Sequence, residues 1–166
     1  MMRLFLLLVF FFCVMQPPAY AEDNKKTASI SPWLYKKLTK TENLIAKKDY
    51  QKAEQKLKVM LADVDKKSYE QAVVLRSLSS VYAIKGQYKK AAEILAKVIN
   101  LNVLPSEQEQ QAFLNLGQLY MAIEQYNKAI QILEPWLLNN PKSNAQINAL
   151  LANAYSQLKK YRKALP

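Results

Sequence analysis

The chain has 166 residues, carries 24 Lys and Arg against 13 Asp and Glu, and contains no His and a single Cys. A chain without imidazole lacks the commonest general base and a usual zinc ligand. With only two glycines it has no Gly-rich phosphate-binding loop, and no serine lies in a G-x-S-x-G turn. We therefore expect a protein that is not an enzyme and that has no catalytic residues, cofactor or metal.

Residues 1–21 have the pattern of a cleaved secretory signal peptide. Arg3 supplies the positive start, Leu4 to Val14 form an unbroken apolar run, and Ala19-Tyr20-Ala21 predicts cleavage before Glu22. An uncleaved anchor is the weaker interpretation, because the apolar run is shorter than the ~20 residues that a spanning helix needs. The sequence thus predicts an exported protein.

The polar residues 22–31 predict a flexible leader, followed by one helical domain at 32–166. Ser31 is expected to cap the first helix, with Pro32 at its first position, and Asp49 to cap the second. This first unit, at about 34–67, suits an N-terminal capping unit. Its two helices carry apolar stripes of Trp33, Leu34, Leu38, Thr41 and Ile45, then Tyr50, Ala53, Leu57 and Met60.

The second unit is expected at about 72–105. Helical spacing of apolar residues predicts two helices around a turn at Lys85-Gly86-Gln87. Residues 102–105, which end in Pro105, read as an extended connection to the next unit.

The third unit, at about 110–141, has the clearest pattern. Ser106 and Glu109 have the spacing of a capping box ahead of it. Gly117 and Ala129 have almost no side chain, which predicts a close approach of the two helices there. Pro141 is expected to end the unit. The two helices carry Phe113, Leu116 and Tyr120, then Ile130, Leu133 and Leu137, with a polar break at 123–125 between them.

The fourth unit, at about 145–166, is incomplete. Ser143 and Gln146 have the spacing of a second capping box, and Lys159-Lys160 marks the turn of the unit. Because the second helix of this unit is cut short, we expect Leu151 and Tyr155 to be exposed, and the chain to be a piece of a longer protein.

The same residues recur in phase along the chain. Tyr50, Tyr88, Tyr126 and Tyr161 are each followed three residues later by Ala, at steps of 38, 38 and 35 residues. This pattern, with an aromatic residue, Leu-Gly, Tyr, Ala and a final Pro in the third unit, resembles the tetratricopeptide repeat (TPR). The resemblance implies an all-α solenoid of about three and a half helix–turn–helix repeats.

The TPR resemblance also implies a concave groove that binds a segment of a partner protein. Its contact positions fall mostly on neutral amides, which can hydrogen-bond an extended backbone; the alternative is that they are solvated helix positions. Some TPR domains bind a C-terminal carboxylate with a clamp that this chain matches only at Arg76 and Asn115, so we do not expect that ligand here. The predicted partner-binding residues are Arg76, Ser77, Ser80, Gln111, Leu114, Asn115, Gln118, Gln146, Asn153 and Gln157.

The formal charge of +11 has two interpretations. Lysine pairs lie at helix ends and breaks, where they favour solubility. Alternatively they form a basic rim that binds anionic lipid, cell-wall polymer or an acidic partner, a short-range attraction in physiological salt. We expect no nucleic acid partner, because the signal peptide directs the chain away from it. The pairs are Lys47-Lys48, Lys66-Lys67, Lys89-Lys90 and Lys159-Lys160.

The stretch from Ser68 to Pro166 resembles periplasmic TPR proteins associated with TonB energy-transduction systems of Gram-negative bacteria. The resemblance rests on three sequence segments: SEQEQQAFLNLGQLY, LEPWLLNNP and LLANAYSQLKKYRKALP. It implies a periplasmic scaffold that assists TonB-dependent transport and contacts components of that system. Our hypothesis is an exported protein-binding scaffold, with an envelope-surface binder that uses the basic rim as the alternative.

Overall fold

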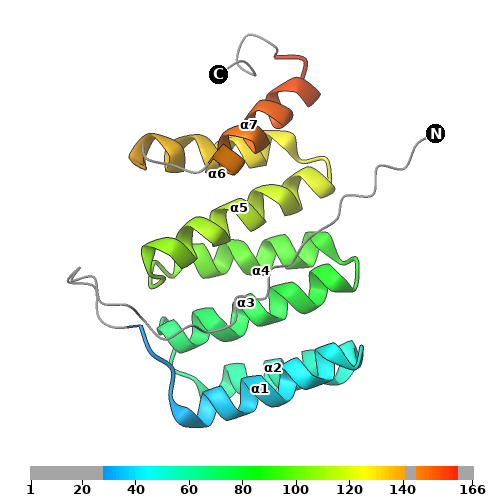
Figure 1. Cartoon of the computed structure of the whole chain (residues 1–166), viewed down its shortest axis with the longest axis vertical. Coiled ribbons are helices and arrows are strands. Elements are labelled where there is room, and N and C mark those ends of the chain that lie inside the picture. Colours follow the sequence, from blue (N-terminus) through cyan, green and yellow to red (C-terminus); the bar gives the residue numbers. More distant parts are fainter. Residues whose placement is uncertain (1–27, 141–144, 161–166) are drawn as a thin grey trace.

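The structure is a computed structural model that describes residues 28–140 and 145–160 (Figure 1). The predicted signal peptide, Pro141, Ser143 and Tyr161 lie outside these residues. The described part of the chain folds into α-helices alone, and none of these helices is long and apolar enough to cross a membrane. The helices are α1 (Pro32–Ala46), α2 (Tyr50–Asp63), α3 (Tyr69–Ile84), α4 (Tyr88–Asn100), α5 (Ser106–Ala122), α6 (Tyr126–Asn139) and α7 (Ala145–Gln157).

The helices stack in chain order as antiparallel pairs, with α7 following the third pair (Figure 1). Each helix packs on the next, and α1 also contacts α3, as α5 contacts α7. No pair of even-numbered helices in the described part packs to that extent. The pairs α1–α3 and α5–α7 thus pack side by side on the surface formed by the odd-numbered helices, and we call this surface the inner face. The predicted all-α solenoid is confirmed.

The turns that follow the odd-numbered helices repeat the same backbone geometry. One residue in each turn adopts a left-handed conformation, with φ between 57° and 71°. The next residue donates its N–H to the carbonyl five residues earlier, at 2.8–2.9 Å, as in a Schellman helix end. The left-handed residues are Lys48, Gly86, Glu124 and Lys159, at the predicted steps of 38, 38 and 35.

Helix starts agree with the predicted caps at two positions and disagree at a third. Ser31 Oγ accepts a hydrogen bond from the Leu34 N–H, and Asp49 Oδ1 accepts one from Lys52. The capping box of Ser106 and Glu109 is wrong, because Ser106 already belongs to α5 and Pro105 occupies the cap position without a side-chain bond. The fixed φ of Pro105, −58°, suits the chain for entering the helix, and the Glu109 N–H bonds the Pro105 carbonyl instead.

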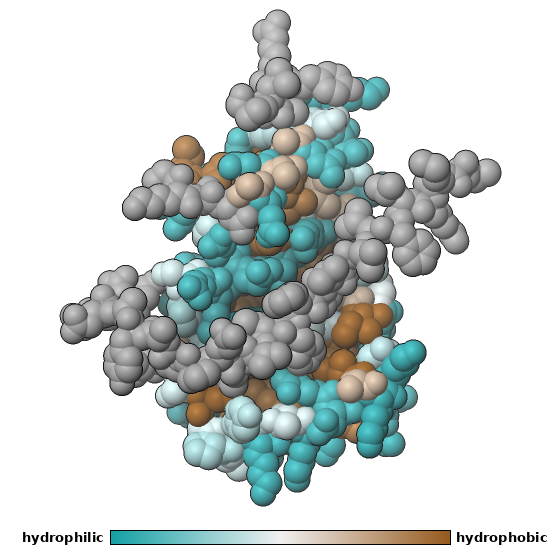
Figure 2. All heavy atoms as spheres, viewed as in Figure 1, coloured by the Kyte–Doolittle hydropathy of each residue, from teal (hydrophilic) through white to brown (hydrophobic). Residues whose placement is uncertain are grey.

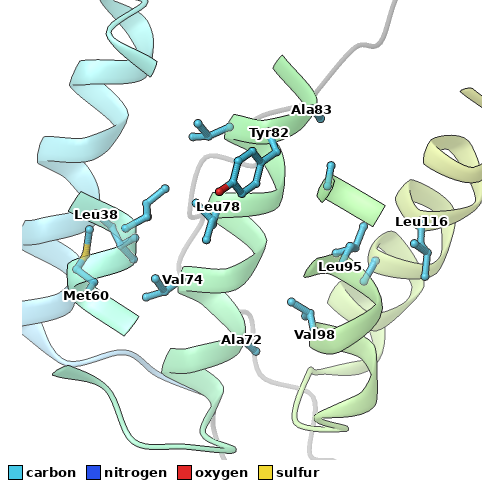
Figure 3. Packing of buried hydrophobic residues seen from close by; sticks show 14 of the residues in the cluster. Leu38, Met60, Ala72, Val74, Leu78, Tyr82, Ala83, Leu95, Val98 and Leu116 are labelled. Atoms are coloured by element: carbon cyan, nitrogen blue, oxygen red, sulfur yellow. The ribbon is translucent and has the colours of Figure 1, made fainter. Parts of the chain in front are cut away.

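Buried apolar side chains form two clusters that meet at α5. In the first, Val74 and Leu78 point from α3 toward Leu38 and Met60 of the first pair (Figure 3). The second joins α5, α6 and α7 around Leu133 and Ile147, both without exposed surface. From α5, Ala112, Leu116 and Leu119 belong to the first cluster and Leu114 to the second.

The small residues lie where the helices approach most closely. Ala53, Ala91 and Ala129 have no exposed surface. A Cβ on Gly117 would lie 2.8 Å from Leu133 Cδ1 and 2.7 Å from Leu150 Cδ2, which is closer than side chains pack. The predicted close approach at Gly117 and Ala129 is confirmed, and at Gly117 it involves α7 as well as α6.

Two expectations about exposure are wrong. Leu151 and Tyr155 are only 6% and 5% exposed, because α6 covers this side of α7 and the Tyr155 hydroxyl donates a hydrogen bond to Glu134. Trp33, expected in the buried stripe of α1, is 41% exposed. Its ring lies 4.1 Å from Lys37 Nζ, in the geometry of a cation–π contact at the surface.

Candidate protein-binding groove

All ten predicted partner-binding residues lie on α3, α5 or α7, the helices of the inner face. Hydrophilic side chains cover the middle of the face in Figure 2, over α5. We distinguish two sections of the groove, the α3–α5 section and the α5–α7 section, because their side chains are arranged differently. The three predicted residues of α7 are exposed, those of α3 are half-buried, and Leu114 of α5 is buried.

In the α3–α5 section the polar side chains bond one another. Arg76 Nη1 donates to Gln108 Oε1 at 2.5 Å, and Gln108 Nε2 donates to the Tyr69 hydroxyl at 2.8 Å. The hydroxyls of Ser77 and Ser80 donate to the carbonyls four residues earlier in α3, at 3.2 Å. The predicted contact residues of α3 are therefore engaged within the chain, and Gln108 links α3 to α5.

The α5–α7 section contains an open pocket of about 330 Å³. Its size is at the lower end of the ~300–1,000 Å³ range of small-molecule sites. Four of its lining residues belong to the predicted set, and none of the six carries a charge. They are Leu114, Gln118, Gln146, Ala149, Leu150 and Asn153.

The missing side chain of Gly117 gives this pocket its floor. Leu150, which lines the pocket, lies where a Cβ on Gly117 would be, next to the fully buried Leu133. With Ala in place of Gly117, Leu150 would have to shift. Gly117 therefore lets α7 pack closely on α5 beneath the pocket.

Amide pairs lie beside the pocket on both helices. Gln111 Nε2 donates to Asn115 Oδ1 at 2.8 Å along α5, and Gln157 Nε2 approaches Asn153 Oδ1 at 3.4 Å along α7. These contacts orient the side chains of Asn115 and Asn153 along the groove. The structure thus brings Gln118, Gln146 and Asn153 together at the pocket and leaves Gln111, Asn115 and Gln157 alongside it.

The repeat phase explains why the two sections differ. A step of 38 residues from Arg76 leads to Leu114, and a further step of 35 leads to Ala149. The position that holds a guanidinium in α3 thus holds apolar side chains in α5 and α7. The same phase would have predicted Ala149, which our sequence reasoning missed. It gives no signal for Tyr69 and Gln108, because their bond joins two units.

Tyrosines at the end of the odd-numbered helices pair with glutamates of the preceding helix. The Tyr82 hydroxyl donates to Glu54 at 2.8 Å, and Tyr155 donates to Glu134. Burial and the bond to Glu134 raise the pKa of Tyr155 to about 12. Burial, with a smaller contribution from Glu93, also raises the pKa of Tyr120. The bonds of Tyr82 and Tyr155 link successive units to each other.

A second hollow, of about 630 Å³, lies at α2 and the end of α3. It surrounds Glu54, whose carboxylate accepts from Lys58 and Lys85, each at 2.6 Å. These hydrogen bonds lower the pKa of Glu54 to about 2, so the group stays ionised at neutral pH. Glu54 therefore serves as a link between α2 and α3.

Comparison with known proteins agrees with this architecture. Residues 82–154 match the tetratricopeptide repeat family. MamA, from residue 41 to its end, of Desulfovibrio magneticus RS-1 superposes with a TM-score of 0.64 at 20% identity, over 82% of this chain and 72% of that one. The Sgt2 TPR domain of Aspergillus fumigatus gives 0.61 at 18% identity, over 85% and 89%.

A Podosopora anserina chain with nearly identical TPR-like repeats gives a TM-score of 0.68 at 20% identity, over 84% of this chain and 72% of that one. No curated protein matches the sequence. At these identities the likeness establishes the fold alone. The chain therefore has the all-α fold of a TPR solenoid.

Proposed function

We propose that this TPR solenoid is a non-enzymatic scaffold that binds a segment of a partner protein on its inner face. The observation that carries the proposal is the open pocket between α5 and α7, lined at the repeat positions that face the groove. TPR domains in general bind proteins or peptides there. The contacts offered by Gln118, Gln146 and Asn153 are those of neutral amides, which both donate and accept hydrogen bonds.

The test is capture of partner proteins from a cell-envelope extract at high salt, with identification by mass spectrometry. We expect one or more proteins to be retained by the wild-type chain and lost with Gln118→Ala/Asn153→Ala. Val59→Ala is the matched control, because Val59 is 60% exposed on α2, away from the inner face. Equal capture by the wild-type chain and the groove variant would contradict the proposal.

We also propose that the protein works in the periplasm, where it assists a TonB system. The support is the pattern of Arg3, the apolar run of 4–14 and Ala19-Tyr20-Ala21, together with the resemblance of residues 68–166. N-terminal sequencing of the protein from a periplasmic fraction should begin at Glu22. A cytoplasmic chain that begins at Met1 would refute export, and groove-dependent capture without any TonB component would refute the specific role.

A second candidate function, binding to an anionic surface of the cell envelope, is favoured by the placement of the lysine pairs. Lys47-Lys48 and Lys159-Lys160 are exposed in the turns that follow α1 and α7, and Lys89-Lys90 is exposed in the first turn of α4. These turns lie along one edge of the stack, on the right in Figure 1, whereas Lys66-Lys67 lies at the turn from α2 to α3 on the other edge. A basic edge of this kind, interrupted by Glu124 at the turn between α5 and α6, suits a peripheral contact with anionic lipid or wall polymer.

Binding to vesicles of anionic lipid in low and high salt separates the two functions. If the basic edge binds, Lys89→Glu/Lys90→Glu should reduce retention, and the matched variant Lys66→Glu/Lys67→Glu should not. Retention should also fall at high salt, because screening weakens exposed charges. Equal effects of the two variants would indicate nonspecific attraction and eliminate this candidate.

A further inference from the structure

The α5–α7 pocket differs from its surroundings in charge. The whole chain carries +11, yet the side chains that line the pocket are apolar or neutral amides. Burying the charge of a ligand there without an opposite charge or full hydrogen bonding would be unfavourable. The pocket therefore suits a ligand without charge.

The lining divides into an apolar floor and a polar rim. Leu114 and Leu150 supply the apolar floor, Ala149 lies at its exposed edge, and amides from both helices form the rim: Gln118, Gln146 and Asn153. The two leucines can contact an apolar side chain of a peptide, and the amides match the N–H and C=O groups of an extended backbone on either side.

The neighbouring α3–α5 section limits where on the inner face a peptide can bind. Arg76 carries the positive charge of the α3–α5 section, and its guanidinium is held in that section by its hydrogen bond to Gln108. At the equivalent positions, Leu114 and Ala149 provide no charge. The groove thus consists of the α3–α5 section, whose polar side chains bond one another, and the α5–α7 section, which has an open neutral pocket.

We propose that the α5–α7 pocket selects an extended, uncharged peptide segment by inserting one apolar side chain of valine to methionine size between Leu114 and Leu150. Gln118, Gln146 and Asn153 bond the backbone of the segment on both sides of that residue. This inference rests on the proposed scaffold function and adds the chemical class of the segment.

The experiment is binding of the labelled protein to an array of random heptapeptides, acetylated and amidated so that their ends carry no charge. We expect enrichment of peptides with one central Val, Leu, Ile or Met and with neutral flanking residues. Ala149→Arg places a guanidinium at the exposed edge of the pocket, at the position equivalent to Arg76. It should reduce binding of the enriched peptides by about tenfold or more.

Two controls keep the result interpretable. Val59→Ala should leave binding of the enriched peptides within about twofold, because Val59 is exposed on α2, away from the inner face. The circular dichroism spectrum of Ala149→Arg should match that of the wild-type chain, since Ala149 is exposed. If Ala149→Arg is not folded, Asn153→Asp, which introduces a charge at another exposed lining position, takes its place.

The outcomes separate this inference from the proposed function. Enrichment of acidic peptides, or loss of binding in Val59→Ala with none in Ala149→Arg, would overturn the inference and leave the scaffold function standing. Absence of any enriched peptide, combined with capture of partners that does not depend on the groove, would overturn both.

Discussion

The two sections of the inner face use equivalent positions in opposite ways. Between α3 and α5, Arg76 reaches Gln108 and the section is closed by bonds within the chain. Between α5 and α7, the equivalent residues Leu114 and Ala149 leave an open pocket. The difference shows that repeats with the same backbone can have different roles. The α3–α5 interface holds two units together, whereas the α5–α7 interface has an open pocket that can accept a ligand.

The contrast extends through the rest of the molecule. Glu54 accepts bonds from two lysines and Tyr82 in the N-terminal region, so that link has several donors. The corresponding contact between α6 and α7 joins Glu134 and Tyr155, within the second and smaller cluster. We therefore expect the C-terminal region to be the less stable of the two, which the following measurements test.

The largest expected effect is that of Leu133→Ala, which removes a fully buried side chain of the second cluster beneath Gly117 and Leu150. The free energy of unfolding should fall by about 2–5 kcal/mol. Hydrogen exchange should show the loss mainly in α5 to α7. Leu138→Ala, at a position 83% exposed, is the control. An equal loss of protection in α1 and α2 would show that the regions unfold as one.

Removal of a tyrosine hydroxyl compares the two links directly. Tyr155→Phe leaves Glu134 without that donor and should cost about 1.5–3 kcal/mol, the range for hydrogen bonds to charged groups. Tyr82→Phe should cost less, about 0.5–1.5 kcal/mol, because Glu54 keeps Lys58 and Lys85. Urea unfolding at neutral pH measures both. A larger loss for Tyr82→Phe would reverse the order of the two links.

Acid should weaken the N-terminal link. The pKa of Glu54 is about 2 in the folded chain and close to 4.5 when unfolded, so ionised Glu54 stabilises the fold above pH 4.5. That contribution, about 1–2 kcal/mol after allowance for solvent screening, should disappear as the pH falls from 4.5 toward 2. Glu54→Gln should lower stability at pH 7 and flatten the acid dependence. The same acid slope in wild type and variant would exclude Glu54 as its source.

The smallest expected effects on stability are those of substitutions in the turns. The left-handed residue is a glycine in the turn between α3 and α4 and a glutamate in the turn between α5 and α6. Gly86 has φ of +71° and open space around the position of a Cβ, so Gly86→Ala should cost about 1 kcal/mol through backbone strain alone. Glu124, the equivalent residue between α5 and α6, has φ of +59°. Glu124→Gly should change stability by less than about 1 kcal/mol and in the favourable direction. Thermal unfolding measures both, and shifts of the same sign would contradict this account.

Local chemistry in the sequence was sufficient to predict much of the fold. Ser31 and Asp49 marked helix starts, and the repeat spacing of Tyr50, Tyr88 and Tyr126 coincides with the first residues of α2, α4 and α6. The capping box at Ser106 failed because Pro105 already occupies the cap position. The burial of Tyr155 was missed because it depends on Glu134, a residue of another unit.

The candidate site was less predictable than the fold. Repeat phase identified the helices of the inner face and four of the pocket residues, among them Gln118 and Asn153. It could not show that Gln108 would bond Arg76, since periodicity describes which face a residue occupies and says nothing about pairing across units. The division of the groove into two sections therefore emerged only from the structure.

The left-handed turns have a consequence for surface design. Their shape is maintained by main-chain hydrogen bonds, and Lys48, Gly86, Glu124 and Lys159 all adopt it. Apart from the modest preference of a left-handed residue for glycine, the side chains at these four places are not needed to hold the turns. The surface charge of this edge could therefore be changed from positive to negative one turn at a time. The resulting proteins would share one fold and differ stepwise in their electrostatic potential.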